Sequence, residues 1–103
     1  MDKKSIEIAK KFASRIKKEI EAEKVILFGS RARGDNFQRS DFDFLIVSKK
    51  FSNIPVIFRM SILYDYWNED IDMEAICYTP EEFKKRKNQL GIVRKAVSEG
   101  IEI

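Results

Sequence analysis

The sequence predicts an α/β (α+β) protein of two layers, in which helices pack on a small mixed β-sheet. Short apolar runs typical of buried strands occur at 24–29, 41–48 and 71–78. Longer segments between them carry apolar residues every three or four positions, as amphipathic helices do. The alternation of the two kinds of segment favours helices packed on one sheet, but it leaves the strand order open.

The first helix is expected over 3–22, and the next from a cap at Ser52 or Asn53 to about Trp67, with Pro55 in its first turn. Residues 79–82, Thr-Pro-Glu-Glu, form a capping box that predicts a further helix, interrupted near Gly91. Gly100 should end it, and residues 101–103 could add a short edge strand.

Length and composition indicate one soluble globular domain over residues 1–103. Hydrophobic residues make up 44% of the chain and charged residues 36%, which is ordinary for such a domain. No apolar run approaches the roughly 20 residues of a membrane helix, and the N-terminus does not resemble a signal sequence. We therefore expect a cytoplasmic protein without a membrane partner.

The chain has no histidine and a single cysteine, Cys77. An internal disulfide, a Cys-His or Ser-His-Asp mechanism and a typical zinc site are thereby excluded or disfavoured. Chemistry must use carboxylates, hydroxyls, lysines and arginines. The net charge of +3 suits an anionic ligand, but it is too small to indicate nucleic acid as the main partner.

Gly29-Ser30 directly follows the first predicted strand. A glycine there allows close approach of a phosphate, and the following turn can direct backbone N–H groups at it. A simple strand-ending turn is the alternative. Arg31, Arg33 and Arg39 follow and could neutralise phosphate charge, although a solvated basic loop is the favoured explanation for at least one of them, above all Arg39.

Asp41 and Asp43 lie two residues apart on the second predicted strand, so their side chains share one face. Two carboxylates this close repel each other unless a cation lies between them, and magnesium favours such hard oxygen ligands. Asp72 or Glu74, on the third strand, could complete a catalytic group of three acids. A solvated acidic face is the alternative explanation.

The pattern Gly29-Ser30, ten residues, then Asp41-Phe42-Asp43 resembles the signature of the polymerase-beta-like nucleotidyltransferases, and of their minimal (MNT) branch in particular. The resemblance implies that Gly29 and Ser30, with Arg31 and Arg33 nearby, bind a nucleoside triphosphate. It implies two Mg²⁺ ions on Asp41, Asp43 and a third acid, for which Asp72 fits best and Glu74 is second. The implied reaction transfers a nucleoside monophosphate, AMP from ATP, and releases pyrophosphate.

Members of this size resemble the antitoxins of HEPN/MNT pairs, which implies a small helical HEPN partner as acceptor. Two apolar stripes on the helix before residue 67 are wider than one packed face requires, which favours a partner; burial inside the monomer is the alternative. A homo-oligomer stays open. A non-catalytic antitoxin that blocks its partner sterically is the second functional hypothesis. The stripes are Val56, Met60, Leu63 and Trp67, and Ile54, Phe58, Ile62 and Tyr66.

Two other features have simpler explanations. Cys77 is expected to pack as a small apolar residue. The run Lys84-Lys85-Arg86-Lys87 is expected to be a solvated helix face, with binding of an acidic partner or RNA as the alternative.

Overall fold

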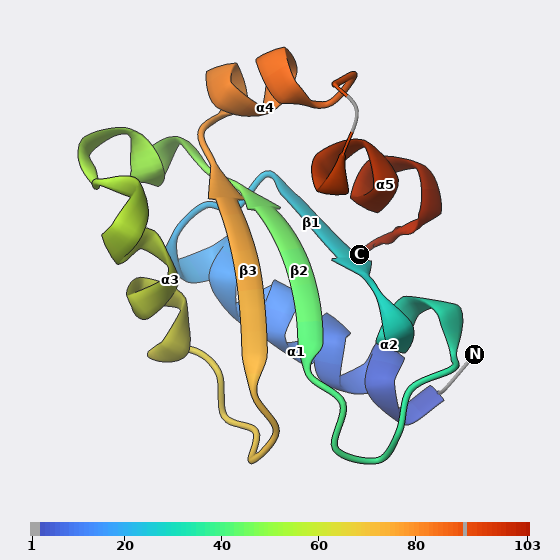
Figure 1. The fold of residues 1–103 in the computed structure, drawn as a ribbon. Helices are drawn as coiled ribbons and strands as arrows, with labels where there is room; N and C mark the ends of the chain where they lie inside the picture. The colour runs from blue at the N-terminus through green and yellow to red at the C-terminus, as the bar shows by residue number, and fades with distance from the viewer. Residues whose placement is uncertain (1–2, 90) are drawn as a thin grey trace.

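The computed structural model describes residues 3–89 and 91–103. Within them, helices alternate with the strands of one sheet, as the sequence predicts (Figure 1). The elements, in chain order, are α1 (Lys3–Glu19), β1 (Lys24–Phe28), α2 (Ser30–Arg33), β2 (Phe42–Val47), a 3₁₀ helix (Lys49–Asn53), α3 (Val56–Tyr64), β3 (Met73–Tyr78), α4 (Pro80–Arg86), α5 (Ile92–Glu99) and β4 (Ile101–Glu102).

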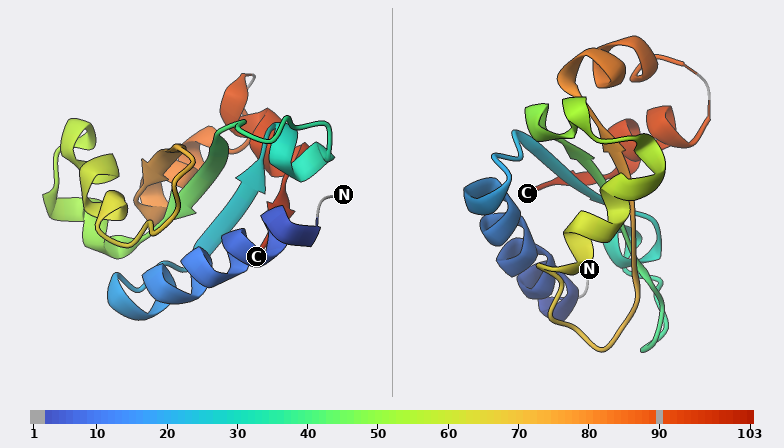
Figure 2. Two further views of the ribbon diagram at one scale, coloured as in Figure 1. Left: turned by 90° about the horizontal axis from the view of Figure 1, so that it is seen from below. Right: turned by 90° about the vertical axis from the view of Figure 1, so that its left-hand side faces the viewer.

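The described strands form a mixed four-stranded sheet in the order β3-β2-β1-β4. β1 is antiparallel to both of its neighbours, whereas β2 and β3 are parallel. Parallel neighbours cannot be joined by a tight turn. The 3₁₀ helix and α3 therefore make the crossover, and they lie beside β3 (Figures 1 and 2).

The main core lies between the sheet and α1, which runs along one face (Figure 2). Its centre is aromatic. Phe12 of α1 lies 5.0 Å from Phe44 and 5.1 Å from Trp67, and Phe42 lies 5.2 Å from Trp67, measured between ring centroids. Edge-on contacts of this kind add to the stabilisation from burial. Cys77 packs in this core and is 6% exposed, and burial raises the pKa of its thiol to about 12.

A smaller core covers part of the opposite face. Ile26, Leu45 and Val47 of the sheet pack there against Val93 and Ala96 of α5. Gly100 brings the end of α5 against β1: a Cβ at this position would lie 2.4 Å from Ile26 Cγ2. α5 thus adds a partial third layer, which the sequence did not predict.

Several element ends confirm the sequence-based expectations. The capping box is present: Thr79 accepts from the Glu82 N–H, and Glu82 accepts from the Thr79 N–H. The helix that follows ends at Arg86 and a new one begins after Gly91, and Gly100 terminates α5. The edge strand β4 pairs with β1.

The expected cap at Ser52 or Asn53 is wrong, as is the helix end near Trp67. Both capping candidates lie inside the 3₁₀ helix, whose cap is Ser48, because its hydroxyl accepts from the Lys50 N–H. α3 begins only after Pro55 and ends at Tyr64, and Trp67 lies beyond the turn formed by Asp65 and Tyr66.

The apolar stripes of α3 are only partly buried. Leu63 is fully buried, but Val56 is 64% exposed and Phe58 56%, and Ile57, which belongs to neither stripe, is 81% exposed beside them. Burial of the whole stripe pair inside the monomer is therefore wrong, because the N-terminal half of α3 presents an apolar surface to solvent.

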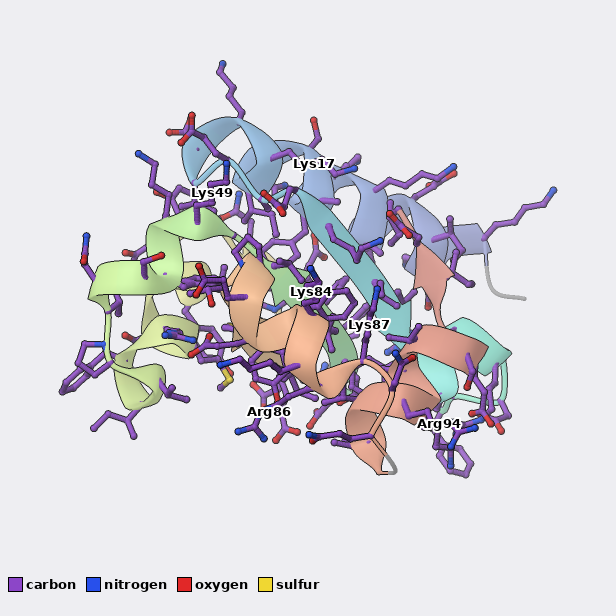
Figure 3. All side chains as sticks on the ribbon, turned by 90° about the horizontal axis from the view of Figure 1, so that it is seen from above. Lys17, Lys49, Lys84, Arg86, Lys87 and Arg94 are labelled. Atoms are coloured by element: carbon purple, nitrogen blue, oxygen red, sulfur yellow. The ribbon has the colours of Figure 1, made fainter. Side chains whose placement is uncertain are left out.

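Basic side chains are distributed over several elements rather than gathered into one patch. Lys84 and Arg86 project from α4, Lys87 directly follows α4 and Arg94 projects from α5, while Lys17 lies on α1 and Lys49 on the 3₁₀ helix (Figure 3). The residues of the 84–87 run are all exposed, as expected for a solvated helix face. Among the described helices, none has the length and apolar character required to cross a membrane.

Arg59 connects the crossover to the end of the sheet. Although it is only 5% exposed, its guanidinium donates to the carbonyl oxygens of Ile54 and Cys77 and to the Glu82 carboxylate, the last at 2.6 Å. α3, β3 and α4 therefore share one buried cation. The hydrogen bonds from Arg59 and then Thr79 lower the pKa of Glu82 below its ordinary value of 4.5.

We predict that Arg59→Ala lowers the free energy of unfolding by about 2–4 kcal/mol, because the Ile54 and Cys77 carbonyl oxygens lose the guanidinium donor and the Glu82 carboxylate keeps only the Thr79 N–H. Because the pKa of Glu82 is lowered by folding, the stability that this pair adds is present above pH 4.5 and is lost as the pH falls through the lowered pKa. Urea unfolding at pH 7 and pH 4 measures both effects. Arg94→Ala, at an exposed position, is the control; equal losses in the two variants would contradict the assignment.

Candidate functional site

Asp41 and Asp43 lie where β2 begins. Asp43 is the second residue of the strand and is half-buried. Asp41 directly precedes the strand and is exposed. Because strand side chains alternate, Phe42 and Phe44 enter the α1 core while the two aspartates lie on the opposite face. That is the face which α5 covers further along β2.

Gly29 lies immediately under the Asp43 carboxylate. The register pairs Phe28, the last residue of β1, with Asp43. A Cβ at position 29 would lie 2.5 Å from Asp43 Oδ2, and Gly29 has φ +75° and ψ −158°, a backbone conformation open almost only to glycine. Both the space and the dihedral angles therefore require glycine here.

The turn after Gly29 continues as α2, whose Ala32 and Arg33 N–H groups donate to the Gly29 carbonyl. The Ser30 hydroxyl has no hydrogen-bond partner among the described residues and stays available to a ligand.

Of the two candidates for a third acid, Glu74 lies closer to Asp43. The parallel register sets Glu74 directly opposite Asp43, and both carboxylates point from the same face. Asp72 precedes β3, and its backbone carbonyl oxygen accepts a hydrogen bond from the Phe42 N–H. Asp72 therefore lies beside Asp41 and not opposite Asp43. Four acids thus line the start of two neighbouring strands.

The electrostatics of Asp43 follow from this arrangement. Burial raises its pKa above the ordinary value of 3.8, as do the negative charges of Glu74 and Asp41, while Arg33 opposes the shift. A cation held between these carboxylates would remove that repulsion, and the all-oxygen donor set fits magnesium. As the described side chains are placed, however, no three Asp, Glu or Cys groups converge on one point suited to a metal ion. Metal binding would require the carboxylates to turn toward each other.

The three arginines have different surroundings. Arg31 is 4% exposed; it donates to the Ser5 hydroxyl and to the carbonyl oxygens of Gln38 and Ser40, and stacks on Phe42. It therefore holds the loop that leads to Asp41 and does not face the carboxylates.

Arg33 is exposed, pairs with Asp35 and lies near enough to influence Asp43. Arg39 pairs with Asp70 in solvent, which agrees with its interpretation as a residue of a solvated loop. The arginine that the structure brings to the acids is therefore Arg33.

The sequence did not indicate the role of Tyr64, at the C-terminal end of α3. Its hydroxyl donates to the carbonyl oxygen of Met73, the residue between the two candidate third acids, at 2.6 Å. Burial raises its pKa, and Asp72, Glu74 and Asp41 raise it further. No motif marks this tyrosine, because α3 is brought to the acids only by the crossover.

Two cavities adjoin the glycine and the acids. One, of about 390 Å³, is lined by Gly29 and Arg33 together with Ile92 and Lys95 of α5. The other, of about 190 Å³, contains Asp43 and Glu74. A larger cavity of about 630 Å³ lies between the 3₁₀ helix and α4 but contains no residue of the motif, so the chemistry locates the site better than cavity size does.

The comparisons with known proteins identify the family. Residues 6–103 match the family described as "Nucleotidyltransferase domain". Among solved structures, a provisionally assigned nucleotidyltransferase from Sulfolobus solfataricus shares 26% identity, with a TM-score of 0.56 over 99% of this chain and 87% of that one. A search of curated proteins finds no match.

Two other similar structures show the fold alone. BolA1 from Arabidopsis thaliana has a TM-score of 0.59 at 20% identity, over 73% of this chain and 94% of that one. The BolA domain of SufE1 from the same plant has a TM-score of 0.57 at 16% identity, over 80% and 98%.

We predict that Gly29→Ala destabilises the fold and also displaces the Asp43 carboxylate. The matched control is Gly91→Ala: Gly91 also has a positive φ, +121°, but a Cβ there meets nothing within 4 Å. Backbone strain of about 1–3 kcal/mol is expected in both variants. Only Gly29→Ala should also change the pKa of Asp43, measured by NMR titration of its carboxyl group at a temperature where both variants are folded. Equal pKa values of Asp43 in the two variants would contradict the close contact.

We predict that Asp43→Asn raises the Tm of the metal-free protein at pH 7 by a few degrees. Because folding raises the pKa of Asp43, the stability tied to its protonated form is complete below pH 3.8 and is lost as the pH rises through the raised pKa. The gain should therefore shrink toward pH 4. Circular dichroism melts in EDTA measure it, with Asp70→Asn as the exposed control. A lower Tm at pH 7 would show that the ionised carboxylate stabilises the fold.

Proposed function

The chain belongs to the nucleotidyltransferase domain family, and on that premise we propose that it transfers a nucleoside monophosphate from a nucleoside triphosphate to an acceptor hydroxyl. We propose AMP from ATP as the group transferred and pyrophosphate as the leaving group. The observation that carries the proposal is the close contact of the Asp43 carboxylate with Gly29, with Asp41 and Glu74 beside Asp43. A backbone segment that a phosphate can approach closely therefore lies next to carboxylates that a cation would stabilise.

The residues divide the work by position. Gly29 and the Ser30 hydroxyl, which has no hydrogen-bond partner among the described residues, would receive the triphosphate, with Arg33 neutralising part of its charge. Asp41 and Asp43 would hold magnesium ions. For the third acid we propose Glu74 in preference to Asp72, because Glu74 is the one opposite Asp43. When bound, two Mg²⁺ ions would supply activation of the attacking hydroxyl and neutralisation of the leaving group.

The exposed surface of α3 supports a protein partner as acceptor. Val56, Ile57 and Phe58 expose most of their surface on one short stretch. Contiguous apolar patches on soluble proteins commonly mark interaction sites. Together with the resemblance to HEPN/MNT pairs, this supports a small helical HEPN protein carrying the acceptor hydroxyl. Tyr64, 42% exposed, lies between this patch and the acids, so a partner bound on α3 would come near the reacting centre.

A second candidate function is favoured by the same patch. A partner bound on α3 could be neutralised by complex formation alone, with the nucleotide site serving no reaction. The grouped acids favour catalysis over this alternative, because burial and then the charges of Glu74 and Asp41 raise the pKa of Asp43, and a purely steric role does not require such a group of acids.

The test is magnesium-dependent transfer of label from α-labelled ATP to the co-purified partner. We expect the double variant Asp41→Ala/Asp43→Ala to abolish labelling, and Glu74→Gln to reduce it by about 100-fold or more, as loss of a catalytic group does. Asp72→Asn should have the smaller effect because Asp72 lies outside β3. Glu7→Ala, an exposed acid on α1, is the control.

The outcomes separate the candidates. Labelling that persists in the double variant would refute the proposed site. Absence of labelling in every variant, with a stable complex in each, would refute transfer to that partner and favour steric neutralisation. A larger loss in Asp72→Asn than in Glu74→Gln would assign the third acid to Asp72.

A further inference from the structure

We infer that α5 forms one wall of the nucleotide site, with Lys95 as a second triphosphate-binding cation and Ile92 as an apolar contact for the nucleoside. The inference rests on the proposed function. Neither residue belongs to the motif, which ends about fifty residues earlier in the chain.

The first observation is the cavity of about 390 Å³ between the end of β1 and α5. Its volume lies within the range of about 300–1,000 Å³ typical of small-molecule sites. Gly29 and Arg33 form one side, and Ile92 and Lys95 form the other. A triphosphate that reaches the Gly29 backbone would therefore also meet α5.

The second observation is the charge around this cavity. Arg33 and Lys95 are both exposed and contribute cations from opposite sides. Arg33 is paired with Asp35, whereas Lys95 makes no ion pair within the part of the chain that the structure describes. Glu99, one turn further along α5, also lines the cavity, so one carboxylate lies in the same cavity as the two cations.

The third observation is the position of Ile92 between the two cavities. It lines the cavity of about 390 Å³ and also the neighbouring cavity of about 190 Å³, which contains Asp43 and Glu74. Phe28 is the other residue common to both. Ile92 is 59% exposed, so its apolar surface is available to a sugar or base that sits beside the acids.

The wall is fixed relative to the sheet. Val93 and Ala96 anchor α5 in the smaller core, and Gly100 holds its end against β1. Ile92 and Lys95 are exposed residues of the same anchored helix. Their distance from the Gly29 turn is therefore set by packing, which suits groups that bind one ligand from two sides.

The experiment compares magnesium-dependent binding of ATP, GTP, CTP and UTP with that of inorganic tripolyphosphate, by calorimetry. For the nucleotide that binds the wild type most tightly, Lys95→Ala should weaken binding about tenfold, and it should weaken tripolyphosphate by a similar factor. Ile92→Ala should weaken the nucleotide about fivefold and leave tripolyphosphate unchanged, because it removes only apolar contact. Lys95→Arg should retain most of the affinity.

Two surface variants are the matched controls: Lys87→Ala directly after α4, and Val97→Ala on α5, which is 40% exposed and lines neither cavity. If the wild type binds nucleotide but Lys95→Ala and Ile92→Ala behave like these controls, the inference about α5 is wrong and the proposed function stands. If the wild type binds neither a nucleotide nor tripolyphosphate, both fail. Equal weakening of tripolyphosphate by Ile92→Ala would overturn the division of roles.

Discussion

The close contact between Gly29 and the Asp43 carboxylate is the constraint on which the rest of the site depends. It exists because β1 and β2 pair in a register that sets Phe28 opposite Asp43, so the turn after β1 passes beneath the acid. A side chain at position 29 would occupy the place of the carboxylate oxygen. Because residue 29 is a glycine, a backbone that a phosphate can approach lies directly beside the Asp43 carboxylate. Neither the glycine nor the aspartate alone would indicate this kind of site.

The alternation of β2 gives its two faces opposite tasks. Phe42 and Phe44 enter an aromatic core with α1, which fixes the strand firmly, while Asp41 and Asp43 are carried on the other face. The rigidity of the apolar face allows like charges to be held close together, since the core opposes their separation. Burial first, and then the repulsion from Glu74 and Asp41, raises the pKa of Asp43, and that repulsion provides a reason for a cation to bind there.

The arrangement of helices and strands does not by itself identify this function. The two BolA structures share the fold at 20% identity or below, with TM-scores close to that of the Sulfolobus solfataricus protein. The identification rests instead on the family match over residues 6–103, and the motif is carried by Gly29 and Ser30 after β1 and by Asp41 and Asp43 at the start of β2. Function here resides in side chains placed on a widely used scaffold.

The sequence by itself determined the fold class, most element boundaries and the pairing of Gly29-Ser30 with Asp41 and Asp43. These depend on local periodicity, on capping residues such as Thr79, and on a spacing within one short segment. It misplaced the start of α3, because a hydrogen bond from Lys50 to Ser48 set up a 3₁₀ helix that residue preferences do not reveal.

Only the tertiary structure decided which acid faces Asp43, since that depends on the register between β2 and β3. Likewise, only packing directed the Arg31 guanidinium to the Ser5 hydroxyl and to two carbonyl oxygens of the loop before β2. Packing also brought Ile92 and Lys95 beside Gly29. Such contacts join residues far apart in the chain. They are set by how whole elements pack, which no short stretch of sequence encodes.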